Sequence, residues 1–476
     1  MTASARDAKV EVERAQEGAA LRRELGLFDL VLVQIIMIVG GTWVGTAGKL
    51  GAQHAVYWLA ASVLFFVPHI AVVIFLNRWL PLEGGLYQWA KVGFNELVGF
   101  LVAYNLWLWG VVLLSALGLE VAQMLSYALG PETAWIREGH AMPMAMTVAI
   151  ILVLAGAALL GLRVGKRIHN AGSLVRLGAY ALLLILPIAS LVMRRPVDYR
   201  PVPIAVPAIT LFSLNILGKM GFGAYSGFEY VAIFAGETKN PRRDITRSVA
   251  IAAPMVLVMF VLGTSSVLAF VKPEDIDLIA PIPQVVSLGT RDMGWARFLA
   301  TATSLGFVVT LLGWGTATFA GITRLPMVAG WDGLLPPWFT KLHPTRKTPV
   351  NSILFVAAVT IVVGVAALSG VGHQEAFQLS SSAGLVFYAL TFIVMFAIPL
   401  ASRSSTMPAP PWWLRLLCVS GLAMTLLFIA LAVFPIIKVK SDLAFTIKVT
   451  TVVVVANVVG VLLFAAGKKR RASLAM

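Results

Sequence analysis

The chain alternates between long apolar segments and short polar connections along almost all of its 476 residues. A transmembrane helix needs about 20 predominantly apolar residues. About twelve segments come close to or exceed this length. They lie near residues 27–48, 55–77, 97–128, 143–162, 172–193, 209–235, 247–270, 295–325, 351–368, 378–400, 413–434 and 443–466. The pattern therefore predicts an all-α polytopic membrane protein with about twelve transmembrane helices.

Glycine interrupts two of these segments near their middles, the first and the sixth. The first reads LVLVQIIMIVGGTWVGTAGKLG and the second reads LFSLNILGKMGFGAYSGFEYVAIFAG. The interrupting residues are Gly40, Gly41 and Gly45 in the first segment, and Gly221, Gly223 and Gly227 in the second. Lipid cannot satisfy the backbone groups that a break frees, so broken helices persist only around a cavity or a solute. Glycine also packs membrane helices closely, but a matched pair of broken spans points to a secondary transporter.

Composition and charge agree with a membrane protein. The chain is 59% hydrophobic and 12% charged, with a mean hydropathy of +0.87, whereas soluble domains have about 25% charged residues. With the N-terminus in the cytoplasm, most of the 37 Lys and Arg residues fall on inner segments. This asymmetry follows the positive-inside rule and predicts a plasma-membrane protein with both termini cytoplasmic. The net charge of +15 therefore reflects topology, and no nucleic-acid partner is expected.

No catalytic or metal-binding pattern occurs in the sequence. The single cysteine, Cys418, lies in an apolar segment, and the six histidines have no ligand spacing. CxxC, HExxH and GxxxxGKS motifs are absent. We therefore expect neither an enzyme nor a cofactor or metal site. The expected partners are a small-molecule substrate and the lipid bilayer, without an obligatory protein partner.

Three connecting segments have a recognisable pattern. GETKNPRRDITRSV (236–249) is close to GE-x-x-NP-R-x-I-P-R-A, with Thr246 where proline is usual. PLEGGLYQWAKVGFNE (81–96) looks like P-x-GG-x-Y-x-W, and RLPMVAGWDGLLPPWF (324–339) looks like R-x-x-x-x-x-A-x-DG-x-LP. In their order along the chain and on the expected inner side, the three segments resemble the amino acid/polyamine/organocation permease family, which has the LeuT-type fold. The resemblance covers roughly residues 25–400.

The resemblance implies a ten-helix core, residues 25–402, with inverted repeats of five helices at about 27–193 and 209–400. Residues 1–24 would be a cytoplasmic tail and not a signal peptide, because they contain no apolar core. The linker RSSTMPAPPWW would open a unit of two accessory helices, 403–467, followed by a basic cytoplasmic tail, 468–476. The loop 272–294 is expected to face outward and to contain a short helix.

The broken spans suggest how an amino acid would bind. Where a helix breaks, the following half offers free N–H groups and the preceding half offers free carbonyls. By resemblance, the N–H groups of Gly41 and Thr42 would meet the carboxylate, and carbonyls of Ile38, Gly223 and Ser226 would meet the ammonium. The full expected site comprises Ile38, Gly40, Gly41, Thr42, Phe222, Gly223, Tyr225, Ser226 and Gly227.

Two departures from the family pattern affect substrate choice. The usual G-x-G of the first break is here Gly40-Gly41-Thr42, so either the Thr42 hydroxyl contributes or the loop is less open. Many relatives have a bulky aromatic residue at Gly223, where it covers the substrate. Glycine is expected to leave that volume empty, so that Phe222 or Tyr225 covers the substrate or the pocket accepts a larger side chain.

Ionisable residues within the spans suggest the coupling mechanism. Proton-dependent or exchange-type relatives often have lysine at the position of Arg176, where its charge replaces a sodium ion. A charge at this depth is functional by default, although Arg176 lies about one turn into the expected span and could instead reach the inner surface. Glu229 is the candidate proton relay, ahead of Glu120 and His69. All three could equally be structural.

The sequence therefore predicts a secondary transporter of amino acids that works by alternating access, independently of sodium and by proton coupling or exchange. Two alternatives stay open. A polyamine or organic-cation permease would need acidic side chains in the pocket. An ion cotransporter of the same superfamily would not need a carboxylate cradle.

Overall fold

The computed structural model describes residues 21–129, 131–133, 135–278, 280–291, 294, 296–368, 373–402, 404–434 and 441–474. Most of the expected N-terminal tail, and the end of the expected C-terminal tail, lie outside these residues. The described residues form an all-helical bundle in which the sole β-pairing is an isolated bridge between Leu25 and Thr238. The predicted all-α fold is confirmed.

Ten helices are long and apolar enough to cross a membrane in the described part of the chain, or eleven when a bent pair is counted as one span. The bent pair is α2 (Leu27–Ile38) and α3 (Gly41–Gly48), whose axes differ by 43°. This is the predicted break of the first span. The expected sixth span, 209–235, is divided into three short pieces: α12 (Leu211–Gly218), the π-helix η4 (Lys219–Ala224) and the 3₁₀-helix η5 (Phe228–Glu237).

The other helices follow the apolar pattern closely. In chain order they are η1 (Gly51–Gln53), α4 (His54–Ala61), η2 (Ser62–Phe66), α5 (Val67–Trp79), α6 (Leu86–Gly93), α7 (Glu96–Ser115), α8 (Leu117–Leu129), η3 (Pro131–Thr133), α9 (Trp135–Glu138), α10 (Ala141–Leu160), α11 (Leu162–Val192), α13 (Pro241–Leu268), η6 (Pro273–Asp275), α14 (Pro281–Gly289), α15 (Ala296–Trp331), η7 (Pro337–Thr340), α16 (Val350–Leu368), α17 (His373–Ala401), α18 (Trp412–Ala432) and α19 (Asp442–Leu474). Helix α14 is the short helix expected in the 272–294 loop.

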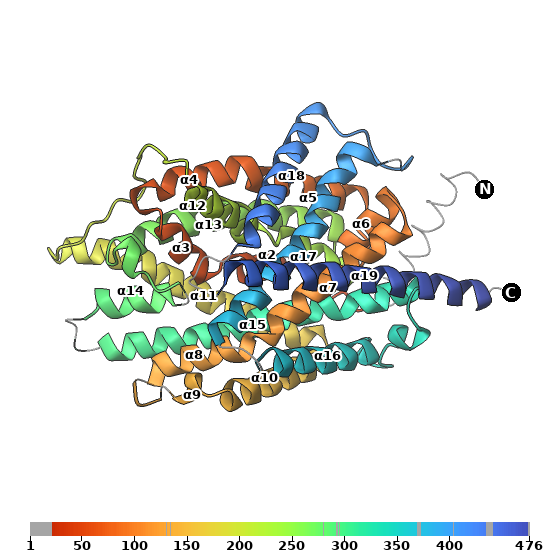
Figure 1. Ribbon diagram of the computed structural model, residues 1–476, viewed down its shortest axis with the longest axis horizontal. Helices are drawn as coiled ribbons and strands as arrows, with labels where there is room; N and C mark the ends of the chain where they lie inside the picture. The colour runs from red at the N-terminus through yellow and green to blue at the C-terminus, as the bar shows by residue number, and fades with distance from the viewer. Residues whose placement is uncertain are drawn as a thin grey trace.

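Most of the long helices run along the long axis of the molecule, and the C-terminal end of α19 lies at one end of it, which we call the terminal face (Figure 1). Helix α14 lies toward the opposite end (Figure 1). Helix α11 begins at Leu162, ten residues before the expected start of that span at 172. Arg176 consequently lies near the middle of a 31-residue helix. The expected position one turn into the span is therefore wrong.

The last two helices pack on the rest of the bundle through specific contacts. Phe428 of α18 stacks on Phe222 of η4, with ring centroids 4.5 Å apart. The side-chain amides of Asn457 in α19 and Asn105 in α7 exchange two hydrogen bonds, of 2.7 and 3.2 Å. Reciprocal amide pairs of this kind join helices in an apolar environment, where neither group could pair with water. Helix α18 thus supports the broken sixth span directly.

Candidate functional site

The two breaks lie against each other. A Cβ added at Gly227 would lie 2.9 Å from Cγ1 of Ile38, and one added at Gly223 would lie 2.6 Å from Cη2 of Trp43. Gly227 also has φ of +123°, which favours glycine. The chain therefore needs glycine at both positions, for close approach at Gly223 and also for backbone conformation at Gly227. Segments almost 190 residues apart in sequence meet at this point.

The first break leaves part of its backbone without partners. The N–H groups of Val39, Gly40 and Trp43 donate to the carbonyls of Ile35, Ile38 and Gly40, respectively. Among the described residues, the N–H groups of Gly41 and Thr42 have no hydrogen-bond acceptor. They form the start of α3, where the helix dipole is positive. Thr42 is exposed and Gly41 is half-buried.

Two side chains of helix α11 donate to carbonyls at the first break. The Arg176 guanidinium Nη1 donates to the Ile36 carbonyl at 2.7 Å, and the Tyr180 hydroxyl donates to the Gly40 carbonyl at 3.2 Å. Arg176 is buried, with 5% of its surface exposed. Its position against the end of α2 is one where a bound cation would also be attracted by carbonyl oxygens.

Near Gly223 the volume is filled. The Trp43 indole lies directly over Gly223, so the expectation of an empty volume there is wrong. Phe222 stacks on Phe428, and Tyr225 stacks on Phe66 with centroids 4.2 Å apart. Phe222 and Tyr225 are fully buried in these contacts. Trp43 therefore lies over Gly223, at the position that the sequence analysis assigned to Phe222 or Tyr225.

The second break has a buried carboxylate at its centre. Glu229 Oε2 lies 2.8 Å from His69 Nε2 and accepts the Gly227 N–H at 3.1 Å. Glu229 Oε1 accepts the hydroxyl of Tyr388. His69 Nδ1 lies 3.0 Å from the Tyr225 carbonyl, which only accepts, so Nδ1 must carry a hydrogen. The Nε2–Oε2 contact then requires a second proton, shared between His69 and Glu229.

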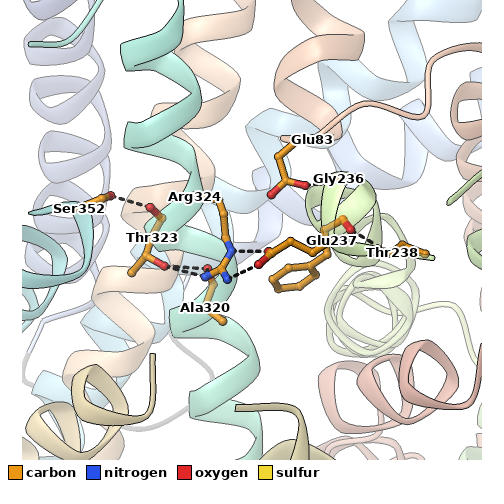
Figure 2. A network of polar contacts seen from close by, with 9 residues as sticks. Glu83, Gly236, Glu237, Thr238, Ala320, Thr323, Arg324 and Ser352 are labelled. Carbon is orange, nitrogen blue, oxygen red and sulfur yellow. Dashed lines mark hydrogen bonds and ion pairs between the residues drawn. The ribbon is translucent and has the colours of Figure 1, made fainter. Parts of the chain in front are cut away.

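At the terminal face, a buried ion pair joins the end of η5 to α15 (Figure 2). The Arg324 guanidinium bonds both carboxylate oxygens of Glu237, at 2.8 and 3.0 Å. The Gly236 N–H donates to Glu83 at 2.7 Å. Burial, and then the neighbouring Glu237 carboxylate, raise the pKa of Glu83 well above its usual range. These contacts bring together all three recognisable segments, because Glu83, Glu237 and Arg324 each come from a different one.

The sequence analysis missed Trp43, Tyr180 and Tyr388. Trp43 directly follows the first break in the sequence, and this position was a signal that its side chain lies near the site. Tyr180 lies one helical turn after Arg176, on the same face of α11. Tyr388 carries no local signal, because it reaches Glu229 from a helix 159 residues further along the chain.

Comparison with known proteins assigns the class. The family model described as amino acid permease matches residues 25–457. The chain is 23% identical to an uncharacterized transporter of Legionella pneumophila over 398 residues, covering 82% of this chain and 83% of the relative. It is 25% identical to the branched-chain amino acid permease of Bacillus subtilis over 399 residues (77% and 81%). It is 25% identical to the methylthioribose transporter of the same organism over 396 residues (77% and 81%).

The protein is thus a polytopic membrane transporter. It belongs to the amino acid permease family, within the amino acid/polyamine/organocation permeases.

We predict that Gly223→Ala destabilises the protein, because the new Cβ would lie 2.6 Å from a Trp43 ring atom. Gly178→Ala is the matched control, since nothing lies within 4 Å of a Cβ added there. Thermal unfolding of both variants in detergent measures the difference. A lowered midpoint for Gly223→Ala alone, and its partial recovery in Gly223→Ala/Trp43→Ala, is the expected result. Equal midpoints for both single variants would refute the close contact.

Proposed function

We propose that the protein carries amino acids across the membrane by alternating access and binds them between the two breaks. The supporting observation is that the N–H groups of Gly41 and Thr42 are without acceptors beside a second break whose Ser226 carbonyl receives no backbone N–H among the described residues. Donors at one break and an acceptor at the other complement the carboxylate and ammonium of an α-amino acid. The proposed site keeps Gly223 and Ile38 as backbone contacts, since the Ile38 carbonyl accepts one N–H, from Gly40, and has a second lone pair. The Gly40 carbonyl already accepts the Trp43 N–H and the Tyr180 hydroxyl and is not part of the proposed contacts. Gly227 is the residue that lets the breaks meet.

The polyamine alternative has less support. It needs a free acidic side chain in the pocket, and Glu229 is instead fully buried and bonded by His69, Gly227 and Tyr388.

We propose that Trp43, rather than Phe222 or Tyr225, covers the substrate side chain, because it lies at the break with its ring on Gly223.

A thermal-shift screen of the purified protein against amino acids, polyamines and methylthioribose tests the proposed substrate class. A ligand at a hundred times its Kd stabilises the folded state by about 2.7 kcal/mol. We expect a raised unfolding midpoint with one or a few amino acids and none with polyamines. Stabilisation by polyamines alone would favour the cation permease.

We predict that Gly41→Val abolishes amino acid binding, because a branched side chain would fill the space before the free N–H groups. A Cβ at this position meets Phe307 at 3.4 Å and Ile282 at 3.6 Å, which are ordinary contacts. Gly41→Ala should therefore fold normally and keep weakened binding. Binding isotherms of the two variants give the comparison, and unchanged affinity in Gly41→Val would move the site away from this break.

We further propose that transport is independent of sodium, with Arg176 as the fixed cation at the end of α2. Uptake into proteoliposomes should be equal in sodium and in choline buffers of the same ionic strength. Arg176→Ala should lower uptake at least tenfold, because the Ile36 carbonyl loses its donor. Arg176→Lys is the matched control and should retain more activity. Wild-type uptake that rises steeply with sodium would contradict this role.

Glu229 is proposed as the proton-exchanging group of the transport cycle. In Glu229→Gln, the amide nitrogen can donate to His69 Nε2, although the Gly227 N–H then loses its acceptor, and the shared proton is gone. We expect this variant to bind substrate and to lose the stimulation of uptake by an inward proton gradient. Glu120→Gln, which removes the rival candidate carboxyl of α8, is the comparison and should keep the stimulation by the proton gradient. Full proton-driven uptake by Glu229→Gln would show that the proton travels elsewhere.

We also propose that the terminal face is cytoplasmic in a plasma membrane, so that η6 lies outside. Glu274 and Thr345 are both exposed, at opposite ends of the expected topology. In a Cys418→Ser background, an impermeant maleimide added to intact cells should label Glu274→Cys and spare Thr345→Cys. The reverse labelling pattern would invert the topology.

A further inference from the structure

A surface cavity of about 210 Å³ lies at the terminal face, away from the two breaks. Four segments that are distant in sequence line it. They are the N-terminal stretch at Arg22–Glu24, the turn between α10 and α11, the end of η5 at Glu237, and the loop before α16 at Arg346–Thr348. The amino acid site proposed above makes no use of this cavity.

The lining of the cavity carries surplus positive charge. Its basic residues are Arg22, Arg163, Arg346 and Lys347. Its two acids already have partners, since Glu24 pairs with Arg163 at 3.1 Å and Glu237 with Arg324. In the described part of the chain, Arg22, Arg346 and Lys347 have no acidic partner. An anion would therefore be attracted here without displacing an existing ion pair.

Backbone and hydroxyl groups add neutral donors to this charge. Helix α11 starts at Leu162 after Gly161, without a side-chain cap. The N–H groups of Val164 and Gly165 donate to the Gly161 carbonyl, and those of Leu162 and Arg163 have no acceptor among the described residues. Thr348 also lines the cavity and is 3% exposed, and its Oγ1 has no hydrogen-bond partner among the described residues. Its methyl group lies 3.8 Å from a Cβ built at Gly161. Rotation about χ1 would bring the hydroxyl toward the helix start.

Several donors from separate segments suit a ligand with several acceptor oxygens. A phosphate group has these oxygens and binds at the positive end of a helix dipole and to guanidinium groups. One carboxylate has two oxygens and would leave some of these donors without a partner. The chemistry of the cavity therefore favours phosphate.

An apolar stripe beside the cavity indicates that the phosphate belongs to a ligand with an apolar chain. Leu160 lines the cavity and is 50% exposed, and Val153, seven residues earlier on the same face of α10, is 59% exposed. Gly156 lies between them, and nothing stands within 4 Å of a Cβ added there. The stripe gives an acyl chain an exposed apolar surface that leads away from the basic residues.

We propose that this cavity binds the phosphate of an anionic phospholipid, with an acyl chain lying along Val153, Gly156 and Leu160. Bound there, the headgroup joins the N-terminal stretch to α11 and to the loop before α16. It would also lie next to Glu237, the residue paired with Arg324 (Figure 2).

The test is native mass spectrometry of the full-length protein with added phosphatidylglycerol, and with phosphatidylcholine as the zwitterionic comparison. The site variant is Arg346→Gln/Lys347→Asn. Asparagine is chosen because Lys347 has φ of +57°, a conformation that asparagine tolerates. The matched control is Arg242→Gln/Arg243→Gln, which removes the same charge from exposed positions outside the cavity. A third variant, Leu160→Ser, removes apolar surface without changing charge.

We expect phosphatidylglycerol to bind the wild type and the control alike, and to bind the site variant at least tenfold more weakly. Leu160→Ser should also weaken lipid binding, and inorganic phosphate at millimolar concentration should not displace the lipid. Displacement by inorganic phosphate, with Leu160→Ser unaffected, would overturn the lipid assignment in favour of free phosphate. Equal losses in the site variant and the control, or no loss in either, would overturn the site itself.

Discussion

The structure depends on one constraint: a helix that stops inside an apolar bundle frees backbone groups that water cannot reach. At the first break Arg176 donates to the freed carbonyl of Ile36, and Tyr180 donates to the Gly40 carbonyl; both side chains come from α11. At the second break the Gly227 N–H is met by Glu229. The groups that stay free, at Gly41 and Thr42, are the ones that a solute could occupy. The proposed binding site is thus what remains after the protein's own side chains have satisfied the other groups.

The same contacts connect the breaks to the rest of the bundle. Glu229 is bonded to His69 of α5 and Tyr388 of α17. At the terminal face the buried Arg324–Glu237 pair fixes the end of η5 to α15. Breaking a buried pair by removing one partner typically costs about 3–5 kcal/mol, so movement of η5 must re-pair these charges. A change in protonation at Glu229 would therefore act on the same short segment that this ion pair holds.

Much of this architecture could be predicted from the sequence, because apolar length and glycine placement are local signals. The all-helical fold and the break at Gly40-Gly41 were predicted in this way and are confirmed. The start of α11 was not, since Arg163, Lys166 and Arg167 made its first turns look like a loop. The sequence also did not predict that Trp43 fills the space over Gly223, because this contact depends on how two distant segments pack. Contacts across the bundle, such as that of Tyr388 with Glu229, leave no trace in either local sequence.

The central claim is that backbone groups of the two breaks bind both charged ends of an amino acid. The most direct measurement is competition by analogues of the best substrate for its uptake into proteoliposomes. One analogue has the α-carboxylate converted to an amide, and another has the α-amino group acetylated. The account predicts that each modification lowers apparent affinity at least a hundredfold, because each removes one of the two charges. Analogues that compete as well as the parent amino acid would contradict it.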